Sequence, residues 1–338
     1  RYIAGNKSLS DFGFRRAHGP GAILAARAAI VGGFQTTSNV YAALTYHIET
    51  AGTMAHSFVE SYDSELEAFR AFAKSRPHHC IFLVDTYDTL HSGVPNAIKV
   101  AKEMEIAGQK AAGIRLDSGD LSYLAKHARM MLNEAGLSYM KIVASNQLDE
   151  FVIKSLLEQG APIDIFGVGT KLVTGQPDAA LDGVYKLSMA AGEPRLKVSE
   201  TAQKITLPGI KQVYRLINED GMFSGADAIV LEQEKLFDMI YNPFEPIQSL
   251  TTHSYSKQPL LVKVMENGKR VLPPSTLAEI TSYSSKRLDL LPKEYKRFEN
   301  PHTYKVGVSK QLLDLRNHLV DQHKKQKSES ASPDRYTK

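Results

Sequence analysis

Six short clusters of polar residues each follow an apolar run of the sequence. Together they hold carboxylates, hydroxyls, one arginine, one histidine and a glycine-rich stretch. The clusters lie at residues 36–39, 53–57, 85–88, 115–120, 145–146 and 167–170. Basic side chains and backbone amides bind phosphate, whereas carboxylates bind divalent cations. The set therefore predicts a site for a polyanionic sugar phosphate with a divalent cation, although each cluster alone would also fit an ordinary cap or turn.

Other chemical motifs are weaker. The sequence Gly-Val-Gly-Thr at residues 167–170 would let backbone amides approach a phosphate. The chain has neither a Walker A sequence nor the third glycine of a dinucleotide fingerprint. The sequence Asp-Phe-Gly at residues 11–13 is not followed by a His-Arg-Asp loop, which excludes a protein kinase. The adjacent histidines at residues 78–79 would not share one face of a helix or strand, so we expect no metal site there.

Alternating strands and helices are needed to position these clusters. The apolar runs predict strands at residues 81–84, 113–116, 141–144 and 163–166, with two shorter strands at 33–35 and 53–55. Helical stretches separate them, with Asp120 at an N-cap position and glycines at 108, 136 and 160 after helix ends. About six consecutive strand–helix units favour a (β/α) barrel, whose active site lies at the carboxyl ends of the strands. A doubly wound open sheet is the alternative.

The pattern changes after Gly183. Strand-like runs at 184–188, 212–217, 228–231 and 260–264 follow one another without helices, and Asn267-Gly268 marks a hairpin turn. Helices are expected at 277–290 and 310–323. We therefore expect a barrel with the active site at 1–183, antiparallel strands of a second α/β domain at 184–275, C-terminal helices packing back at 276–323, and a basic flexible tail at 324–338.

Composition limits the class of protein. The chain has 338 residues, 41 of them basic and 37 acidic, so its net charge is only +4. Its basic residues are scattered, and we expect no nucleic-acid partner. The single cysteine excludes an intrachain disulfide and fits a reducing compartment. No long apolar stretch or signal peptide is present, so we expect a cytoplasmic protein that does not insert into membranes.

Four motifs in order resemble the nicotinate phosphoribosyltransferase family. They are residues 11–16, 52–57, 113–120 and 166–170, and the likeness extends to about Val308. The resemblance implies an irregular barrel with a second α/β domain, acting as a homodimer. The implied reaction, part of NAD biosynthesis, joins nicotinate to phosphoribosyl pyrophosphate, releasing nicotinate mononucleotide and pyrophosphate, with coupled ATP hydrolysis and Mg²⁺. Because the chain begins with Arg, we expect that an N-terminal segment of the family is absent.

The resemblance also assigns roles to residues. His56 would be the phosphohistidine that accepts the γ-phosphoryl group of ATP, Asp85 would orient its ring, and Asp117 would bind the ribose. The residues implied to bind nicotinate are Phe12, Ser38, Thr53 and Arg115. Those implied to bind phosphoribosyl pyrophosphate are Arg15, Ser145, Asn146, Gly167, Gly169 and Thr170, with Arg16 as an alternative to Arg15. Residues that ligate the metal directly are not identified.

Three alternatives stay open. A sister phosphoribosyltransferase would act on nicotinamide or quinolinate, but nicotinamide-specific relatives carry an Asp at the position of Ser38, where its charge would repel an acid. A sugar-phosphate aldolase or isomerase on the same kind of barrel would need a lysine at a strand end, and Lys171 is the only near candidate. A non-catalytic ligand-binding regulator is the third.

Overall fold

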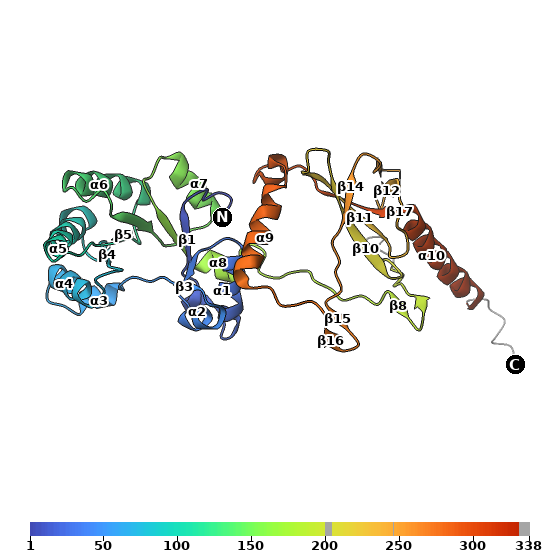
Figure 1. Cartoon of the computed structure of the whole chain (residues 1–338), viewed down its shortest axis with the longest axis horizontal. Helices are drawn as coiled ribbons and strands as arrows, with labels where there is room; N and C mark the ends of the chain where they lie inside the picture. The colour runs from blue at the N-terminus through green and yellow to red at the C-terminus, as the bar shows by residue number, and fades with distance from the viewer. Residues whose placement is uncertain (200–204, 246, 331–338) are drawn as a thin grey trace. The chain divides into compact units, whose positions relative to one another are not determined.

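The computed structural model describes residues 1–199, 205–245 and 247–330, and this part of the chain divides into two compact units (Figure 1). The first unit contains Arg1–Leu181 together with Thr276–Ser284. The second contains Asp182–Ser275 and the chain from Ser285 onward. None of the helices in the described ranges is long and apolar enough to cross a membrane.

A seven-stranded parallel sheet forms the centre of the first unit. Its strands are β1 (Ser8–Asp11), β2 (Thr36–Thr37), β3 (Glu49–Thr50), β4 (Ile81–Leu83), β5 (Gly113–Leu116), β6 (Lys141–Ala144) and β7 (Ile165–Val168). Their order is β3-β2-β1-β7-β6-β5-β4. The chain thus advances in one direction from β1 to β3 and in the same direction from β4 to β7, which pairs with β1.

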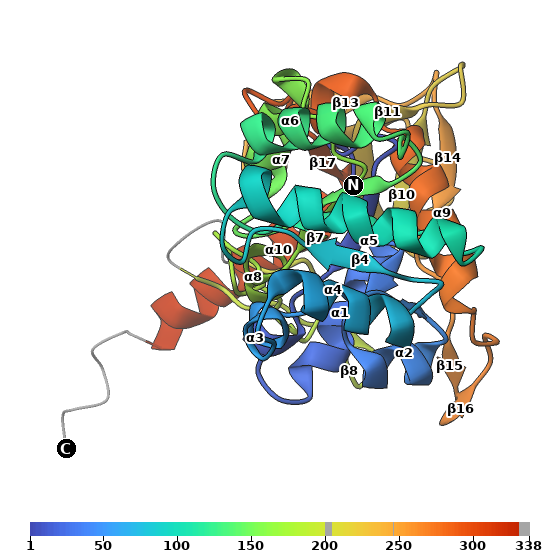
Figure 2. The same cartoon turned by 90° about the vertical axis from the view of Figure 1, so that its left-hand side faces the viewer.

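This winding decides between the two expected architectures. Right-handed crossovers that all advance in one direction put every helix on the same face of the sheet. A doubly wound sheet must instead reverse its direction at a switch point. The sheet is therefore a curled barrel that is open between β3 and β4, and the doubly wound alternative is wrong. Helices α4, α5 and α6 lie along its outer side (Figures 1 and 2).

The helix signals that the sequence offers are confirmed, since Gly108, Gly136 and Gly160 have positive φ just after helix ends and Asp120 precedes a helix. The helices are α1 (Gly21–Val31), α2 (Val40–Tyr46), α3 (His56–Glu60), α4 (Glu65–Ser75), α5 (Val94–Ile106), α6 (Leu121–Glu134), α7 (Glu150–Glu158) and α8 (Thr170–Thr174), with short turns η1 (Phe14–Arg16) and η2 (Thr89–Gly93). Asp120 caps α6 by accepting hydrogen bonds from the backbone N–H groups of Ser122 and Tyr123. The apolar faces of these helices bury strand residues such as Phe82, Ile114 and Phe166.

Three strands of this sheet are shifted from their predicted positions, and a fourth was not predicted. The short strands expected at 33–35 and 53–55 lie at Thr36–Thr37 and Glu49–Thr50. The strand expected at 163–166 is shifted by two residues, so Gly167 lies inside β7 rather than in a turn. Strand β1 was not predicted, because Ser-Leu-Ser-Asp has no apolar alternation and is stabilised by its neighbours β2 and β7.

The second unit is built on a six-stranded mixed sheet of order β13-β12-β17-β11-β10-β14. Its strands are β10 (Lys211–Ile217), β11 (Phe223–Leu231), β12 (Met239–Tyr241), β13 (Ser249–Thr251), β14 (Ser256–Pro259) and β17 (Lys305–Ser309). All neighbours are antiparallel except β11 and β17. Strands β8 (Met189–Ala190) and β9 (Glu193–Pro194) form a separate hairpin. The strands predicted at 184–188 and 260–264 are wrong, because neither run forms a strand ladder in the described part of the chain. Their backbone hydrogen bonds are isolated ones at the ends of the runs, such as that from the Leu260 N–H to the Val213 carbonyl.

The C-terminal part combines confirmed and corrected predictions. The hairpin at Asn267-Gly268 is confirmed: both residues have positive φ, 48° and 73°, between β15 (Met265–Glu266) and β16 (Lys269–Arg270). Helix α9 (Leu277–Asp289) is followed by the turn η4 (Lys293–Lys296) and then β17, a strand that was not predicted. Helix α10 (Lys310–Ser330) continues beyond the predicted end, so residues 324–330 are helical rather than a flexible tail. The rest of that expected tail, 331–338, lies outside the described residues.

Candidate active site

A cavity of about 520 Å³ lies at the carboxyl ends of the parallel strands. Nearly all the residues expected to form the site line it, namely Phe12, Arg15, Ser38, Thr53, His56, Arg115, Asp117, Ser145, Asn146, Gly167, Gly169 and Thr170. Asp85 is the exception, since its side chain is 1% exposed and lies behind His56. Parallel strands bring together residues that are more than a hundred positions apart, as the barrel topology predicts.

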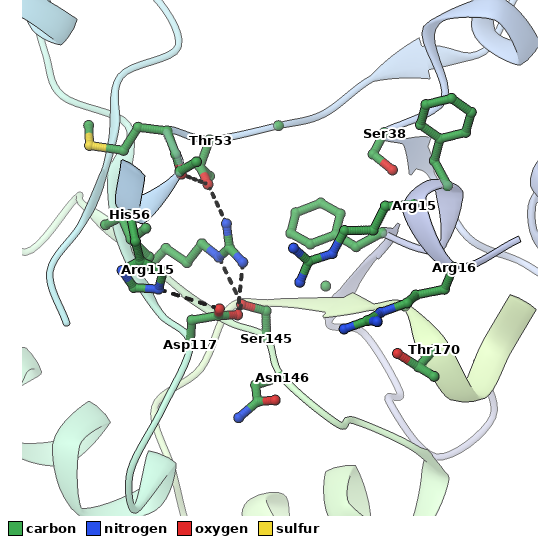
Figure 3. A pocket seen from close by; sticks show the side chains of 18 of the residues that line it. Arg15, Arg16, Ser38, Thr53, His56, Arg115, Asp117, Ser145, Asn146 and Thr170 are labelled. Atoms are coloured by element: carbon green, nitrogen blue, oxygen red, sulfur yellow. Dashed lines mark hydrogen bonds and ion pairs between the residues drawn. The ribbon is translucent and has the colours of Figure 1, made fainter. Parts of the chain in front are cut away.

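Arg115 links three of the strand ends. Its Nε donates to Oγ of Ser145, its Nη1 to Oγ1 of Thr53 and its Nη2 to Oδ1 of Asp117, each at 2.8 Å (Figure 3). A guanidinium group has five N–H donors, so one on each terminal nitrogen remains after these bonds. The Arg115 side chain is only 15% exposed. Its position is thus fixed while two donors stay available for a ligand.

The Asp117 carboxylate forms an ion pair with Arg115 at 2.8 Å. Its Oδ1 accepts hydrogen bonds from Arg115 and from the Ser145 hydroxyl. Burial alone would raise the pKa of Asp117, but the Ser145 hydrogen bond and the charge and hydrogen bond of Arg115 outweigh burial, and the pKa is lowered. Asp117 is the only carboxylate that lines the cavity within the described ranges, and it is held in its charged form.

His56 is the first residue of α3 and is 40% exposed. Its Nε2 lies 3.7 Å from Oδ2 of Asp117 and 4.0 Å from Oδ1 of Asp85, while its Nδ1 lies 3.2 Å from Oγ1 of Thr86. When carboxylates lie near one nitrogen of an imidazole, they favour the tautomer in which that nitrogen carries the proton. The lone pair is then on the other ring nitrogen. The arrangement therefore favours Nδ1 as the nucleophilic atom.

Asp85 connects this histidine to the loop after β5. Its Oδ2 accepts hydrogen bonds from the backbone N–H of Asp117 at 2.9 Å and from the Ser118 hydroxyl at 2.6 Å. Its buried Oδ1 has no hydrogen-bond partner in the described part of the chain. This oxygen lies 4.0 Å from Nε2 of His56 and is thus positioned to face an N–H of that ring.

The loop after β1 carries the aromatic wall of the cavity. Asp11 is buried and uses both oxygens, one accepting from the backbone N–H of Gly13 at 2.8 Å and one from the Thr37 hydroxyl at 2.7 Å. Phe12 donates its backbone N–H to the carbonyl of Val168 at 2.8 Å. The guanidinium carbon of Arg115 lies 5.4 Å from the centre of the Phe12 ring. These bonds fix the ring between the ends of β1 and β7.

Basic and polar side chains approach from the side opposite His56. Figure 3 shows Arg15 and Arg16 pointing into the cavity there, above Thr170 and Asn146. Neither arginine forms an ion pair with any residue that the structure describes. Both are exposed. This side of the cavity can bind phosphate oxygens.

Sequence reasoning missed several lining residues. Phe14, Met54 and Gln147 contribute to the wall without having been singled out. Asn146 and Gln147 both have positive φ, 82° and 49°, a backbone strain that single-sequence patterns do not show. Conversely Lys171, the candidate Schiff-base lysine, does not line the cavity and lies 3.6 Å from Asp149. That geometry disfavours an aldolase.

No cluster of three or more His, Cys, Asp or Glu side chains in the described ranges is arranged to hold a metal ion. Mg²⁺ commonly takes one or two carboxylates and obtains its remaining ligands from substrate phosphates and water. The Asp117 carboxylate lies beside the basic side of the cavity, so it fits a Mg²⁺ ion whose other ligands come from substrate phosphates and water. It does not fit a Mg²⁺ site in which the protein supplies all the ligands.

Comparisons with known proteins agree with this geometry. The model of the nicotinate phosphoribosyltransferase (NAPRTase) family matches residues 7–207, and that of the nicotinate phosphoribosyltransferase C-terminal domain matches residues 210–316. The nicotinate phosphoribosyltransferase of Bacillus subtilis is 43% identical over 319 residues, covering 91% of this chain and 64% of that protein. The chain therefore spans slightly less than two thirds of that relative.

Two solved structures are also similar. Human nicotinic acid phosphoribosyltransferase gives a TM-score of 0.81 at 30% identity, covering 94% of this chain and 72% of the human one. Nicotinate-nucleotide pyrophosphorylase from Pyrococcus furiosus gives a TM-score of 0.67 at 26% identity, covering 86% of this chain and 67% of the other. The predicted fold class, a barrel with a second sheet domain, is confirmed by the first of these.

Proposed function

We propose that this chain, which belongs to the nicotinate phosphoribosyltransferase family, transfers the phosphoribosyl group of phosphoribosyl pyrophosphate to nicotinate. The observation that carries the proposal is Arg115, held by Thr53, Ser145 and Asp117 with two N–H donors remaining beside the Phe12 ring. A planar guanidinium binds a carboxylate with two parallel hydrogen bonds. An aromatic ring beside it suits a pyridine acid.

The acceptor would lie between Arg115 and the loop after β2. Ser38 lines the cavity and brings no negative charge to it. A carboxylate at this position would accept a hydrogen bond from an amide and would repel an acid. The serine therefore supports nicotinate rather than nicotinamide as the acceptor.

The donor would occupy the opposite side. Arg15 and Arg16 would bind its pyrophosphate, while Thr170, Gly169 and Asn146 would contact the ribosyl phosphate. Departure of pyrophosphate leaves positive charge on the ribose carbon, which the Asp117 carboxylate would stabilise. Mg²⁺, when bound, would neutralise negative charge on the leaving pyrophosphate. Because Asp117 stays ionised, it can face this charge without first losing a proton.

ATP coupling would run through His56. The Nδ1 lone pair would attack the γ-phosphorus of ATP, forming an N–P bond as the bond to the bridging oxygen breaks and ADP leaves. Asp85 and Asp117 would retain the proton on Nε2 throughout this step. The exposed ring can meet a nucleotide without any rearrangement of the core.

The proposal includes the homodimer that the resemblance implies and the cytoplasmic location expected from the sequence. Cys80 is the single cysteine of the chain and forms no disulfide, which fits a reducing location. Size-exclusion chromatography with light scattering measures the oligomeric state directly.

One experiment tests the reaction. Pyrophosphate release from phosphoribosyl pyrophosphate is measured with nicotinate, nicotinamide or quinolinate as acceptor, each with and without ATP. We expect release with nicotinate, stimulated by ATP, and product of the mass of nicotinate mononucleotide. Preference for either other acceptor, or binding without release, would replace this function with one of the alternatives.

A further inference from the structure

We infer that Gly167 is a positioning residue for the pyridine acceptor, because its lack of a side chain forms the surface on which the Phe12 ring lies. This inference rests on the proposed function and deepens it. The resemblance alone assigns Gly167 to the phosphoribosyl donor. The geometry around it points to the acceptor instead.

The Phe12 ring occupies the space that a Cβ atom on residue 167 would need. A Cβ built there would lie 2.6 Å from both Cδ2 and Cε2 of the ring and 3.2 Å from Cγ. Carbon atoms in contact are separated by about 3.5 to 4.0 Å. Gly167 lies inside β7 and does not have positive φ. Space for the ring, and not backbone freedom, is therefore what requires glycine here.

The backbone of Phe12 cannot move away to relieve such a clash. Its N–H donates to the carbonyl of Val168, and the next N–H, of Gly13, donates to the buried Asp11 carboxylate. Its carbonyl oxygen would lie only 3.0 Å from a Cβ on Gly169. Gly13 packs against α8, since its own Cβ would lie 2.7 Å from Cβ of Val173. An alanine at 167 must therefore turn the ring itself.

The ring in turn sets one wall of the acceptor's space. The guanidinium carbon of Arg115 lies 5.4 Å from the centre of the ring. The backbone carbonyl of Asp11, the residue before Phe12, accepts a hydrogen bond from the backbone N–H of Ser38 at 2.8 Å. Figure 3 shows Ser38 and Arg115 on opposite sides of the cavity. Restoring normal contact would move the ring by about 1 Å, and a displacement of that size can cost up to about 100-fold in rate. The loss should affect the use of nicotinate.

The test compares steady-state kinetics of the wild type and Gly167→Ala. We expect kcat/KM for nicotinate to fall by roughly 10- to 100-fold, while KM for phosphoribosyl pyrophosphate changes less than about threefold. Gly21→Ala is the matched control, because no atom lies within 4 Å of the added Cβ and its φ is not positive. It should leave both constants unchanged. An equal or larger rise of KM for phosphoribosyl pyrophosphate in Gly167→Ala would overturn the inference.

A double-mutant cycle with Phe12→Ala isolates the contact. In that background the ring is gone, so adding Gly167→Ala should have little further effect on nicotinate use. Should Gly167→Ala fail to fold, the double variant should fold, because the clash is with the ring. A further large loss of nicotinate use when Gly167→Ala is added to Phe12→Ala, or a folding defect of Gly167→Ala that persists in the double variant, would refute the contact as the cause.

Two readouts do not depend on turnover. Calorimetry should show weaker nicotinate binding to Gly167→Ala, and a crystal structure of the variant should show a turned Phe12 ring. A ring in its original position would end the inference even if the enzyme transfers phosphoribosyl groups. Absence of transfer by the wild type would instead count against the proposed function, and the turned ring would still be measurable.

Discussion

Arg115→Lys tests how the acceptor's carboxylate is recognised. The wild-type guanidinium donates to Ser145, Thr53 and Asp117 at 2.8 Å each and retains two N–H donors. A lysine keeps the charge opposite Asp117 but has all its donors on a single nitrogen. It cannot serve these partners and also bind a carboxylate through two parallel bonds. The variant should therefore fold but lose the two parallel hydrogen bonds to the nicotinate carboxylate.

The magnitude follows from the bonds lost. A hydrogen bond to a charged group contributes about 1.5 to 3 kcal/mol. Losing one such bond to nicotinate and weakening the second costs about 3 kcal/mol, or roughly 100-fold in kcat/KM. Nicotinamide carries no charge and should lose about tenfold or less. The preference for nicotinate over nicotinamide should thus fall by at least about tenfold.

The assay measures initial rates with each acceptor at saturating phosphoribosyl pyrophosphate, with thermal unfolding as a check of folding. Arg129→Lys is the matched control, because Arg129 pairs with Asp164 at 3.4 Å and does not line the cavity. It should leave the acceptor preference unchanged. Equal losses for nicotinate and nicotinamide in Arg115→Lys would show that Arg115 supports the fold of the site and does not bind the carboxylate.

Three further predictions concern neighbouring side chains. His56→Ala should abolish ATP hydrolysis coupled to product while leaving slow ATP-independent transfer; ADP and mononucleotide formation are measured together, and continued one-to-one formation would exclude the phosphohistidine. Ser38→Asp should raise nicotinamide use and lower nicotinate use, each by about tenfold, since the new charge repels an acid; an unchanged ratio of kcat/KM values contradicts that role. Because the pKa of Asp117 is lowered in the folded protein, its stabilisation is present above the unfolded pKa of about 3.9 and is lost as pH falls through the lower folded value. Asp117→Asn should therefore flatten the acid side of the stability curve, as measured by urea unfolding from neutral to acid pH; an unaltered slope would contradict the shift.

The parts of the site that the sequence predicts are those set by barrel topology. Strand β5 was predicted at its observed bounds, and it places Arg115 and Asp117 on the end that faces the cavity. Apolar runs such as 113–116 and 141–144 are readable because their burial is continuous. Once those strands are known to be parallel, polar residues after them must converge. The convergence of His56 with Arg115 followed from this rule without knowledge of any side-chain contact.

The remaining features depend on partners that are distant in the sequence. Strand β1 reads as polar, and its place between β2 and β7 is fixed by hydrogen bonds to strands that begin 28 and 157 residues later, at Thr36 and Ile165. The same pairing changes the meaning of Gly167. Its sequence neighbourhood suggests a phosphate turn, but the register that sets Ser10 opposite Gly167 carries Phe12 across the glycine. A residue pattern can show that a glycine is present, whereas only the pairing of β1 with β7 shows which neighbour needs the space.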